Sequence, residues 1–287
     1  MSRFLIDLHT HSNFSPDAND SMEDMCERAQ ELGLSAYAVT DHCDCNLWHS
    51  IEHYFDDPSE AKDPIMYGAG EYAAKSIKKQ TELRDELAGR LNFLVGIELG
   101  QPLQYPEKAE EIASCGELDF IIGSHHQNKG EEDFYFYEYN KMDLKKIYSL
   151  LDDYFAQMLE MCRWGKFDVL GHLTYPLRYI CGDYGIDVDL SRWDGIIREI
   201  FKTLVSNGKG IEINTSGLRQ KYGRTFPELE YVKLFRNMGG EIVTIGSDAH
   251  CAADIGKGIS DGIDVAESAG FRYVSFFKKR KADFIKI

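Results

Sequence analysis

The sequence lacks several features that would place it in common classes of protein. No apolar run reaches the 18 residues that a membrane-spanning helix needs, so we expect no contact with a membrane. The first residues lead straight into a predicted strand, and we therefore expect no signal peptide. The seven cysteines are odd in number and scattered along the chain. This pattern favours reduced thiols and a cytoplasmic protein over a disulfide framework.

Positive charge is scarce as well. The chain has 32 Lys and Arg residues against 48 Asp and Glu residues, for a formal net charge of −16. Its only basic run covers residues 278–281. Nucleic-acid surfaces need a basic stripe, so we predict no nucleic-acid partner. The sequence does not indicate an oligomeric state.

Apolar segments alternate with helical segments over the whole chain. Seven predicted strands cover residues 4–11, 34–40, 91–97, 118–122, 167–170, 210–213 and 241–245. Predicted helices cover residues 21–32, 70–87, 143–163, 192–206 and 227–237, and residues 271–287 predict a final strand or hairpin. This alternation is typical of a parallel sheet covered by helices. Because no Gly-rich nucleotide fingerprint occurs, we favour a closed or nearly closed α/β barrel. With no linker or repeat, residues 1–287 are predicted to form one domain.

The ends of these strands carry side chains that bind metals. The first strand ends in His9-Thr10-His11, and alternation places both imidazoles on one face. Six of the seven strands end in such residues, the sixth strand being the exception, and the set comprises His9, His11, His42, Glu98, His126, His172, Asp248 and His250. The carboxyl ends of barrel strands converge on one face, where active sites lie. We therefore predict a site for several metal ions there.

Three other histidines are less informative. His49 and His53 lie in the long loop after the second strand, where we expect exposure to solvent, and His125 is the ambiguous member of a pair.

A mixed set of imidazoles and carboxylates suits Zn, Mn or Fe better than Mg or Ca. Two such ions, bridged by a carboxylate such as Glu98, stabilise an in-line phosphoryl displacement. We therefore rank hydrolysis of a phosphate ester above hydrolysis of an amide, because amidohydrolases usually also need a lysine at a strand end and none is found.

Six short motifs resemble, in order, those of the PHP (polymerase and histidinol phosphatase) family. They are DLHTH at 7–11, TDH at 40–42, GIE at 96–98, GSHH at 123–126, GH at 171–172 and GSDAH at 246–250. The resemblance implies a distorted (β/α)7 barrel, similar to a TIM barrel, with a metal site at the carboxyl ends of the strands. It also implies a trinuclear site, so we expect two to three divalent transition metals (Zn, Mn or Fe).

The resemblance also implies a set of ligands. His9, His11 and Asp248 correspond to the ligands of one metal, and Glu98 bridges it to a second metal held by His126 and His172. Asp17, His42 and His250 correspond to the third site, where many members have His in place of Asp17. Catalytic roles are expected for Glu98, Asp248 and His250.

Further segments resemble the histidinol-phosphatase branch of this family: NFSPDA at 13–18, EINTSGLR at 212–219 and GFRYVSFFKKRK at 270–281. They imply a small phosphate ester as substrate, histidinol phosphate first. Arg178 and Arg219 are expected to bind its phosphate, with Arg178 also catalytic and His42 a further substrate contact. Loops 43–66, 127–142 and 173–191 are expected to recognise its amine and imidazole. The alternatives are another small phosphomonoester or nucleotide as substrate, or a non-catalytic metal-binding regulatory domain.

Overall fold

The fold is built on a parallel sheet in which most strands are buried along their length. The computed structural model describes residues 6–46 and 71–287. The order of neighbouring strands is β1 (Ile6–Asp7), β2 (Ala36–Val39), β4 (Phe93–Gly100), β5 (Phe120–Ser124), β6 (Val169–Leu170), β7 (Gly210–Asn214) and β8 (Val243–Gly246), and β3 (His42–Asp44) also pairs with β4. All of these pairs are parallel. Burial of both faces explains why these strands are near-continuous apolar runs.

The first and last strands of this order meet, so the sheet nearly closes. The amide of Leu8 donates to the carbonyl of Ile245 at 3.1 Å, and the amide of Asp248 donates to the carbonyl of His9 at 2.7 Å. Beyond them, Thr10 and Ala249 form an isolated parallel bridge. The predicted distorted (β/α)7 barrel is confirmed.

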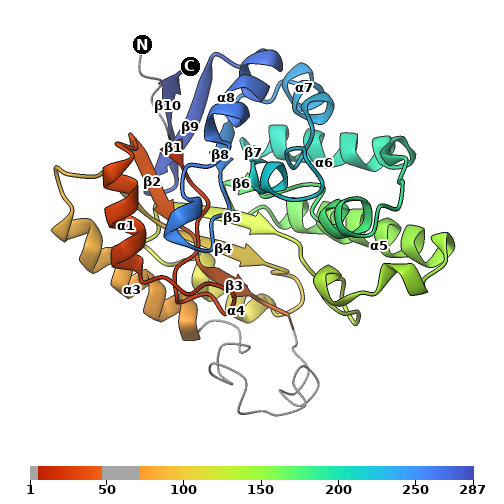
Figure 1. Cartoon of the computed structure of the whole chain (residues 1–287), viewed down its shortest axis with the longest axis horizontal. Helices are drawn as coiled ribbons and strands as arrows, with labels where there is room; N and C mark the ends of the chain where they lie inside the picture. Colours follow the sequence, from red (N-terminus) through yellow and green to blue (C-terminus); the bar gives the residue numbers. More distant parts are fainter. Residues whose placement is uncertain (1–5, 47–70) are drawn as a thin grey trace.

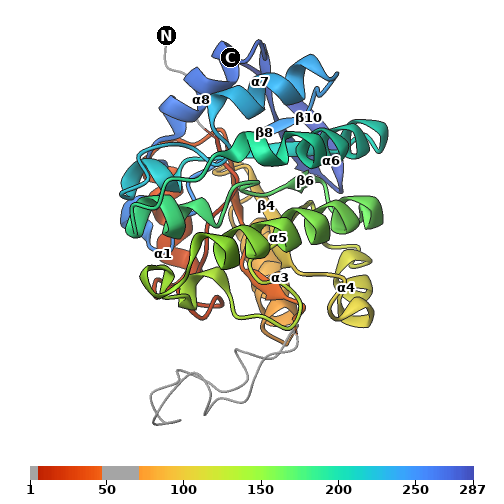
Figure 2. The same cartoon turned by 90° about the vertical axis from the view of Figure 1, so that its right-hand side faces the viewer.

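Helices cover the outside of the barrel (Figures 1 and 2). They are α1 (Met22–Glu31), α3 (Glu71–Glu86), α4 (Pro106–Ala113), α5 (Leu144–Trp164), α6 (Asp194–Ser206), α7 (Leu229–Asn237) and α8 (Ile259–Ser268). Helices α5 and α6 pack against each other on one side of the sheet. None of the helices in the described ranges has the length and apolar character needed to cross a membrane.

The ends of α1 illustrate how local sequence sets the helices. The Ser21 hydroxyl accepts a hydrogen bond from the amide of Asp24 at 3.1 Å, as the predicted capping box requires. After the helix, Gly33 takes φ = 66°, a left-handed conformation that glycine adopts without cost. The helix predicted over 21–32 is therefore confirmed, with Ser21 as its cap.

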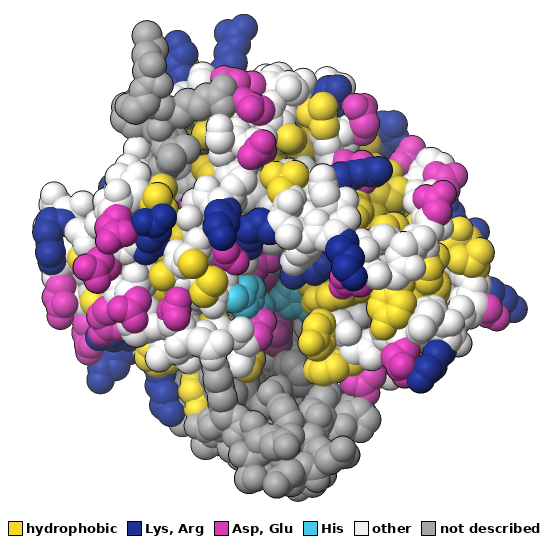
Figure 3. Space-filling model, in the orientation of Figure 1, with side chains coloured by type: hydrophobic (Ala, Val, Ile, Leu, Met, Phe, Trp, Pro, Cys, Tyr) yellow, Lys and Arg dark blue, Asp and Glu magenta, His cyan; other side chains and the backbone are white. Residues whose placement is uncertain are grey.

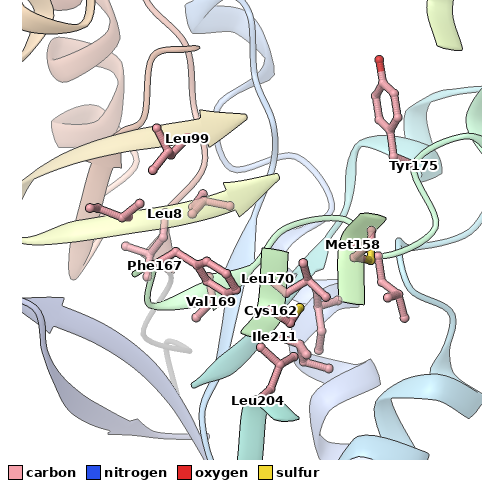
Figure 4. Close-up of a cluster of buried hydrophobic side chains, with 14 of the residues drawn as sticks. Leu8, Leu99, Met158, Cys162, Phe167, Val169, Leu170, Tyr175, Leu204 and Ile211 are labelled. Carbon is pink, nitrogen blue, oxygen red and sulfur yellow. The ribbon is translucent and has the colours of Figure 1, made fainter. Parts of the chain in front are cut away.

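Apolar side chains from the strands pack against the helices in one large cluster. Leu170 of β6 and Ile211 of β7 belong to the same cluster as Met158 and Cys162 of α5 (Figure 4). All four side chains are fully buried. This packing holds the short strands β6 and β7 in place, and with them the residues that follow.

A hairpin at the end of the chain covers the barrel at the amino ends of its strands. Strands β9 (Tyr273–Lys278) and β10 (Lys281–Lys286) are antiparallel. At their turn, Arg280 donates from Nε to Asp168 Oδ2 at 2.5 Å, and its amide donates to the carbonyl of Asp119 at 2.9 Å. Because Asp119 and Asp168 directly precede β5 and β6, the hairpin lies at the amino ends of the strands, away from the predicted site. The hairpin predicted over 271–287 is confirmed.

Several boundaries differ from the prediction. Strand β1 covers two described residues, whereas β4 extends three residues beyond Ile97 and pairs there with β3, in addition to its partners β2 and β5. Helices α4 and α8 were not predicted. The first has only eight residues, and the second contains Gly262, where a Cβ would lie 2.7 Å from Ile245 Cγ2. Close packing on β8 therefore overrides the weak helix propensity of glycine.

Candidate metal centre

Glu98 lies at the centre of the candidate site. It is part of β4 and is fully buried, and its register partner on β3 is His42. Its two carboxylate oxygens face different groups of histidines. Oε1 lies 2.8 Å from His172 Nε2, and Oε2 lies 3.3 Å from His9 Nε2. Glu98 therefore has the position of a bridge between two clusters of donor atoms.

The first cluster joins Glu98 to three residues at the closure of the barrel. His11 Nε2 lies 3.5 Å from Glu98 Oε2 and 3.4 Å from Asp248 Oδ1, and His9 Nε2 lies 3.8 Å from Asp248 Oδ1. Four ligands at zinc-bond lengths in a tetrahedron would be about 3.3 Å apart, as follows from the geometry of a regular tetrahedron. These donor atoms therefore have the spacing of a single metal site.

The second cluster lies on the other side of Glu98. His126 Nε2 lies 3.2 Å from Glu98 Oε1 and 3.2 Å from His172 Nε2. The third group, at the mouth of the site, consists of Asp17, His42 and His250. Asp17 Oδ2 lies 3.0 Å from His250 Nε2 and 3.6 Å from His42 Nε2.

The hydrogen bonds of His9 and His126 orient both rings towards the clusters. His9 Nδ1 lies 2.6 Å from Glu212 Oε1, and His126 Nδ1 lies 3.1 Å from Asp44 Oδ1. A carboxylate only accepts hydrogen bonds, so each Nδ1 carries a proton, and each Nε2 is the atom that faces the cluster and would bind a metal ion there. Such carboxylate partners are the usual support of metal-binding histidines. The Asp44 carboxylate also explains Gly100, where a Cβ would lie 1.8 Å from Asp44 Oδ1.

His11 is oriented through a hydroxyl. Ser15 Oγ donates to Asp41 Oδ1 at 2.9 Å and lies 3.1 Å from His11 Nδ1. Because the single hydroxyl proton goes to Asp41, His11 Nδ1 is the donor in the second contact. Asp41 in turn accepts hydrogen bonds from Ser12 and Ser76. The Nε2 lone pair of His11 therefore faces Glu98 and Asp248.

The charges of the cluster are strongly coupled. Burial alone would raise the pKa of Glu98, but the imidazoles of His9, His126 and His42 outweigh it and lower this pKa well below its usual value. Burial opposes charge on His9 too, yet Glu212, Glu98 and Asp248 raise its pKa well above normal. Burial, with repulsion from His42 and His250, lowers the pKa of His11 to about 3. The Glu98 carboxylate thus remains charged at neutral pH.

Several of these buried atoms lack a hydrogen-bond partner within residues 6–46 and 71–287. They include Nε2 of His9, Nε2 of His11 and Oε2 of Glu98, which all face the first cluster. Leaving buried polar atoms unpaired costs free energy, and a cation satisfies all three at once. The described residues offer further donor groups of the same kind around Glu98. The site therefore fits transition-metal ions.

Asp248 takes a strained backbone conformation at this site. Its φ of 55° is uncommon for a residue other than glycine. Arg219 donates to the carbonyls of Ser247 at 2.8 Å and Asp248 at 3.3 Å, which supports this turn. Arg178 Nη2 donates to Asp248 Oδ2 at 2.7 Å and to Ser216 Oγ at 2.8 Å. Two arginines therefore hold Asp248, one through its backbone and one through its side chain.

A cavity of about 510 Å³ opens above the cluster. In the space-filling view, histidine side chains lie in a hollow of the surface, with acidic and apolar side chains around them (Figure 3). Its lining includes seven of the donor residues and Arg178. It also includes Asp133, Tyr135, Tyr175 and Tyr179, and the Tyr175 ring packs against those of His126 and His172. The cavity is large enough for a small organic ligand.

The structure brings together the nine predicted metal ligands. Arg178 lines the cavity with seven of them, while His9 and His11 are fully buried and do not line it. Arg219 is not among the residues that line it. His125 points away and bonds Asn128 Oδ1 at 3.1 Å through Nε2, while His49 and His53 lie outside the described residues. Whether each predicted residue binds metal or substrate stays a prediction.

Two supporting residues were missed, Glu212 and Asp44. Glu212 of β7 contacts His9 and the amide of His172, and Asp44 of β3 contacts His126, so each supports a histidine from another segment of the sheet. The sequence held one signal for Glu212, which is an acidic residue inside the apolar sixth strand. Burial of an acidic side chain calls for a partner.

The fold and the site together define the class of protein: a parallel β/α barrel with a candidate metal centre at the carboxyl ends of its strands. The model of the PHP domain family matches residues 7–216, and the chain belongs to this family. The family predicted from the sequence motifs is confirmed.

Individual relatives cover almost the whole chain. A probable histidinol-phosphatase of Thermotoga maritima is 28% identical over 281 residues, which cover 96% of this chain and 97% of the relative. The histidinol-phosphatase of Lactococcus lactis subsp. lactis is 25% identical and covers 97% of this chain and 96% of its own length. A crystal structure of histidinol phosphate phosphatase from that organism, complexed with zinc, L-histidinol and phosphate, superposes with a TM-score of 0.75 at 24% identity, over 98% of this chain and 99% of that one. This structural similarity supports the fold.

Proposed function

We propose that the chain is a metal-dependent phosphomonoesterase that converts histidinol phosphate to histidinol and phosphate. The observation that carries the proposal is the convergence of imidazole and carboxylate donors on Glu98, with buried donor atoms that lack partners in the described residues. The relatives that bear the name histidinol-phosphatase support the choice of substrate.

In this proposal two to three divalent transition metals (Zn, Mn or Fe) occupy the centre. His9, His11 and Asp248 would hold one ion, His126 and His172 a second, with Glu98 shared between them. Asp17, His42 and His250 would hold a third. When bound, such ions activate water and neutralise charge on the phosphoryl group.

Arg178 is the residue of the chain best placed to bind the phosphate. It lines the cavity, and its Nε is buried without a partner among the described residues. Its other contacts, to Asp248 and Ser216, hold the guanidinium in place next to the first cluster. Arginine matches a phosphate by bidentate hydrogen bonding. Arg178 would therefore bind the substrate and stabilise the charge that develops on its phosphoryl oxygens.

Arg219 is better placed to act through Asp248 than to touch the substrate. Its guanidinium donates to two backbone carbonyls and lies 3.6 Å from Asp254 Oδ2. We therefore assign it a positioning role. The predicted direct contact with phosphate would require the substrate to reach beyond the residues that line the cavity.

Metal analysis combined with a phosphate-release screen tests the proposal. The purified protein is analysed for bound metals, then assayed with histidinol phosphate, p-nitrophenyl phosphate, a nucleotide and other phosphomonoesters, before and after chelation. We expect the highest kcat/KM with histidinol phosphate, and loss of activity on chelation. Glu98→Gln should lose both activity and metal, because the bridge loses its charge, whereas Glu230→Gln on the surface should not.

Three outcomes would overturn parts of the proposal. Full activity of metal-free protein would exclude the metal centre as the source of catalysis. A higher kcat/KM for p-nitrophenyl phosphate or a nucleotide would assign another substrate. Bound metal without release of phosphate from any ester would indicate a regulatory metal-binding domain.

A further inference from the structure

A second cavity, of about 340 Å³, is formed by the segments that follow β4 and β5 and by helix α5. None of the residues that line it also lines the larger cavity above the candidate metal centre. Its lining includes Gln101, Leu103, His125, Lys129 and Met161. The volume is at the lower end of the range of small-molecule sites, so the cavity suits one small ligand better than a peptide.

The side chain of Gln101 lacks a hydrogen-bond partner in this cavity. Gln101 is 2% exposed, and its Oε1 is buried without a partner among the described residues. The backbone holds it there with φ = 45°, a left-handed conformation that is uncommon for a residue other than glycine. An unpaired buried amide costs free energy, and a ligand that bonds to it would recover that free energy.

His125 provides a second unsatisfied acceptor next to Gln101. Each residue directly follows its strand, Gln101 after β4 and His125 after β5, and the two strands pair in parallel up to their ends. Asn128 Nδ2 donates to the carbonyl of Leu150 at 2.9 Å, so Asn128 Oδ1 accepts from His125 Nε2 at 3.1 Å. In the neutral ring Nδ1 is therefore an acceptor, and it makes no hydrogen bond within residues 6–46 and 71–287.

The charged residues of the lining leave one positive charge without a partner. Glu160 pairs with Arg163, whereas Lys129 forms no ion pair in the described parts of the chain. An exposed lysine without a partner is common, and alone it would indicate nothing. Here it lines the same cavity as two unsatisfied acceptors. One ligand can therefore place an anionic group at the lysine and an N–H donor at the acceptors.

The rest of the lining is largely apolar. Met161 of α5 is buried, while the side chain of Leu103 is 38% exposed. An apolar part of a ligand that covered Leu103 would remove apolar surface from water, which favours binding. The cavity thus matches a small molecule with a carboxylate, an ammonium group and a short apolar side chain.

We propose that this cavity is a binding site for a free α-amino acid with an apolar side chain. Lys129 binds its carboxylate, and its ammonium group donates to Gln101 Oε1 and His125 Nδ1. Its side chain packs on Leu103 and Met161. The proposal goes beyond the phosphomonoesterase function and does not depend on it, because the two cavities share no lining residue.

Calorimetric titration of the purified protein with L-leucine, L-methionine and L-phenylalanine tests the proposal. We expect at least one of them to bind saturably, at one site per chain. Lys129→Met and Gln101→Gly should each weaken that binding about 10- to 100-fold, the range for loss of a hydrogen bond to a charged group. Glycine adopts the φ of position 101 without strain, so the second variant should keep its fold. Lys145→Met, which removes an exposed lysine outside the cavity, is the matched control.

Two further comparisons identify the groups of the ligand and the cavity that holds it. The amine and the carboxylic acid that lack the carboxylate or the ammonium group of the tightest-binding amino acid should each bind at least about tenfold more weakly. Arg178→Ala removes a cation from the larger cavity and should leave the dissociation constant of the amino acid unchanged.

Other results would overturn the inference. It fails if none of the three amino acids binds saturably, or if either Lys129→Met or Gln101→Gly keeps wild-type affinity. Equal weakening in Arg178→Ala would place the ligand in the larger cavity, and equal weakening in Lys145→Met would reduce the effect to one of overall charge. An analogue that binds as tightly as the amino acid would exclude the assigned ligand class. Failure of the proposed phosphatase function is a separate result, seen in phosphate release and not in these titrations.

Discussion

Replacement of Glu212 by glutamine tests whether the centre depends on residues that do not touch the metal. Glu212 is buried beneath the first cluster. Its Oε1 accepts from His9 Nδ1 at 2.6 Å, and its Oε2 accepts from the amide of His172 at 3.0 Å and from Asn214 Nδ2 at 3.3 Å. One carboxylate therefore positions one predicted ligand from each of the two clusters.

Glutamine has nearly the same shape but only one acceptor oxygen. Whichever way its amide turns, its NH2 group opposes either Nδ1–H of His9 or the amide of His172. Loss of such a supporting contact typically costs 10- to 100-fold in metal affinity or activity. That factor corresponds to about 1.4–2.7 kcal/mol of binding free energy. We expect Glu212→Gln to fall in this range.

The assay is a competition titration of the metal against a chromophoric chelator, with kcat/KM for histidinol phosphate measured at limiting and at excess metal. We expect weaker binding and partial recovery of activity in excess metal, because the ligands themselves remain. Glu230→Gln, an exposed residue paired with Lys233, is the control for loss of one negative charge. Unchanged metal affinity and kcat/KM in Glu212→Gln would refute the view that this hydrogen bond supports the centre.

Three further predictions concern the site and its packing. Arg178→Ala should lower kcat/KM for histidinol phosphate about 10²- to 10³-fold with metal content intact, and Arg219→Ala should lower it less; wild-type kinetics in both variants would contradict their roles. Asp17→Ala should reduce turnover and lose one metal while the other two stay bound, which metal analysis and steady-state kinetics would check. Gly246→Ala places a Cβ 2.3 Å from His9 Cβ, so we expect about 1–3 kcal/mol of destabilisation by chemical denaturation, together with weaker metal binding.

The positions of the candidate ligands could be predicted because they depend on local order. Alternation along the first strand places His9 and His11 together, and their ring centroids lie 5.1 Å apart. Parallel strands bring their carboxyl ends to one face, so Glu98, His126 and His172 meet although they belong to different strands. The two ends of α1 could also be predicted, because Ser21 and Gly33 interact only with residues close to them in the sequence.

Element boundaries were less predictable where packing decided them. Glu98 was expected after the third strand, yet β4 continues to Gly100 because β3 pairs with it at that point. Strand β3 continues the parallel register of β2 on β4 after an interruption at Thr40 and Asp41, and apolar periodicity does not show this continuation. Helix α8 contains a glycine that lowers its local propensity and is accommodated by close packing on β8.

The sequence by itself determined which residue types stand at the ends of the strands, and with them the family, the barrel and the candidate ligands. Only the tertiary structure decided which side chains support them. Glu212 and His9 are separated by 203 residues and meet at 2.6 Å, while Asp133 meets Tyr175 from a different loop. Only the tertiary structure shows that Arg219 binds the backbone of Asp248, whereas Arg178 lines the cavity. The physical reason is that strand periodicity sets the direction of a side chain locally, whereas a hydrogen bond between distant segments depends on the packing of the whole barrel.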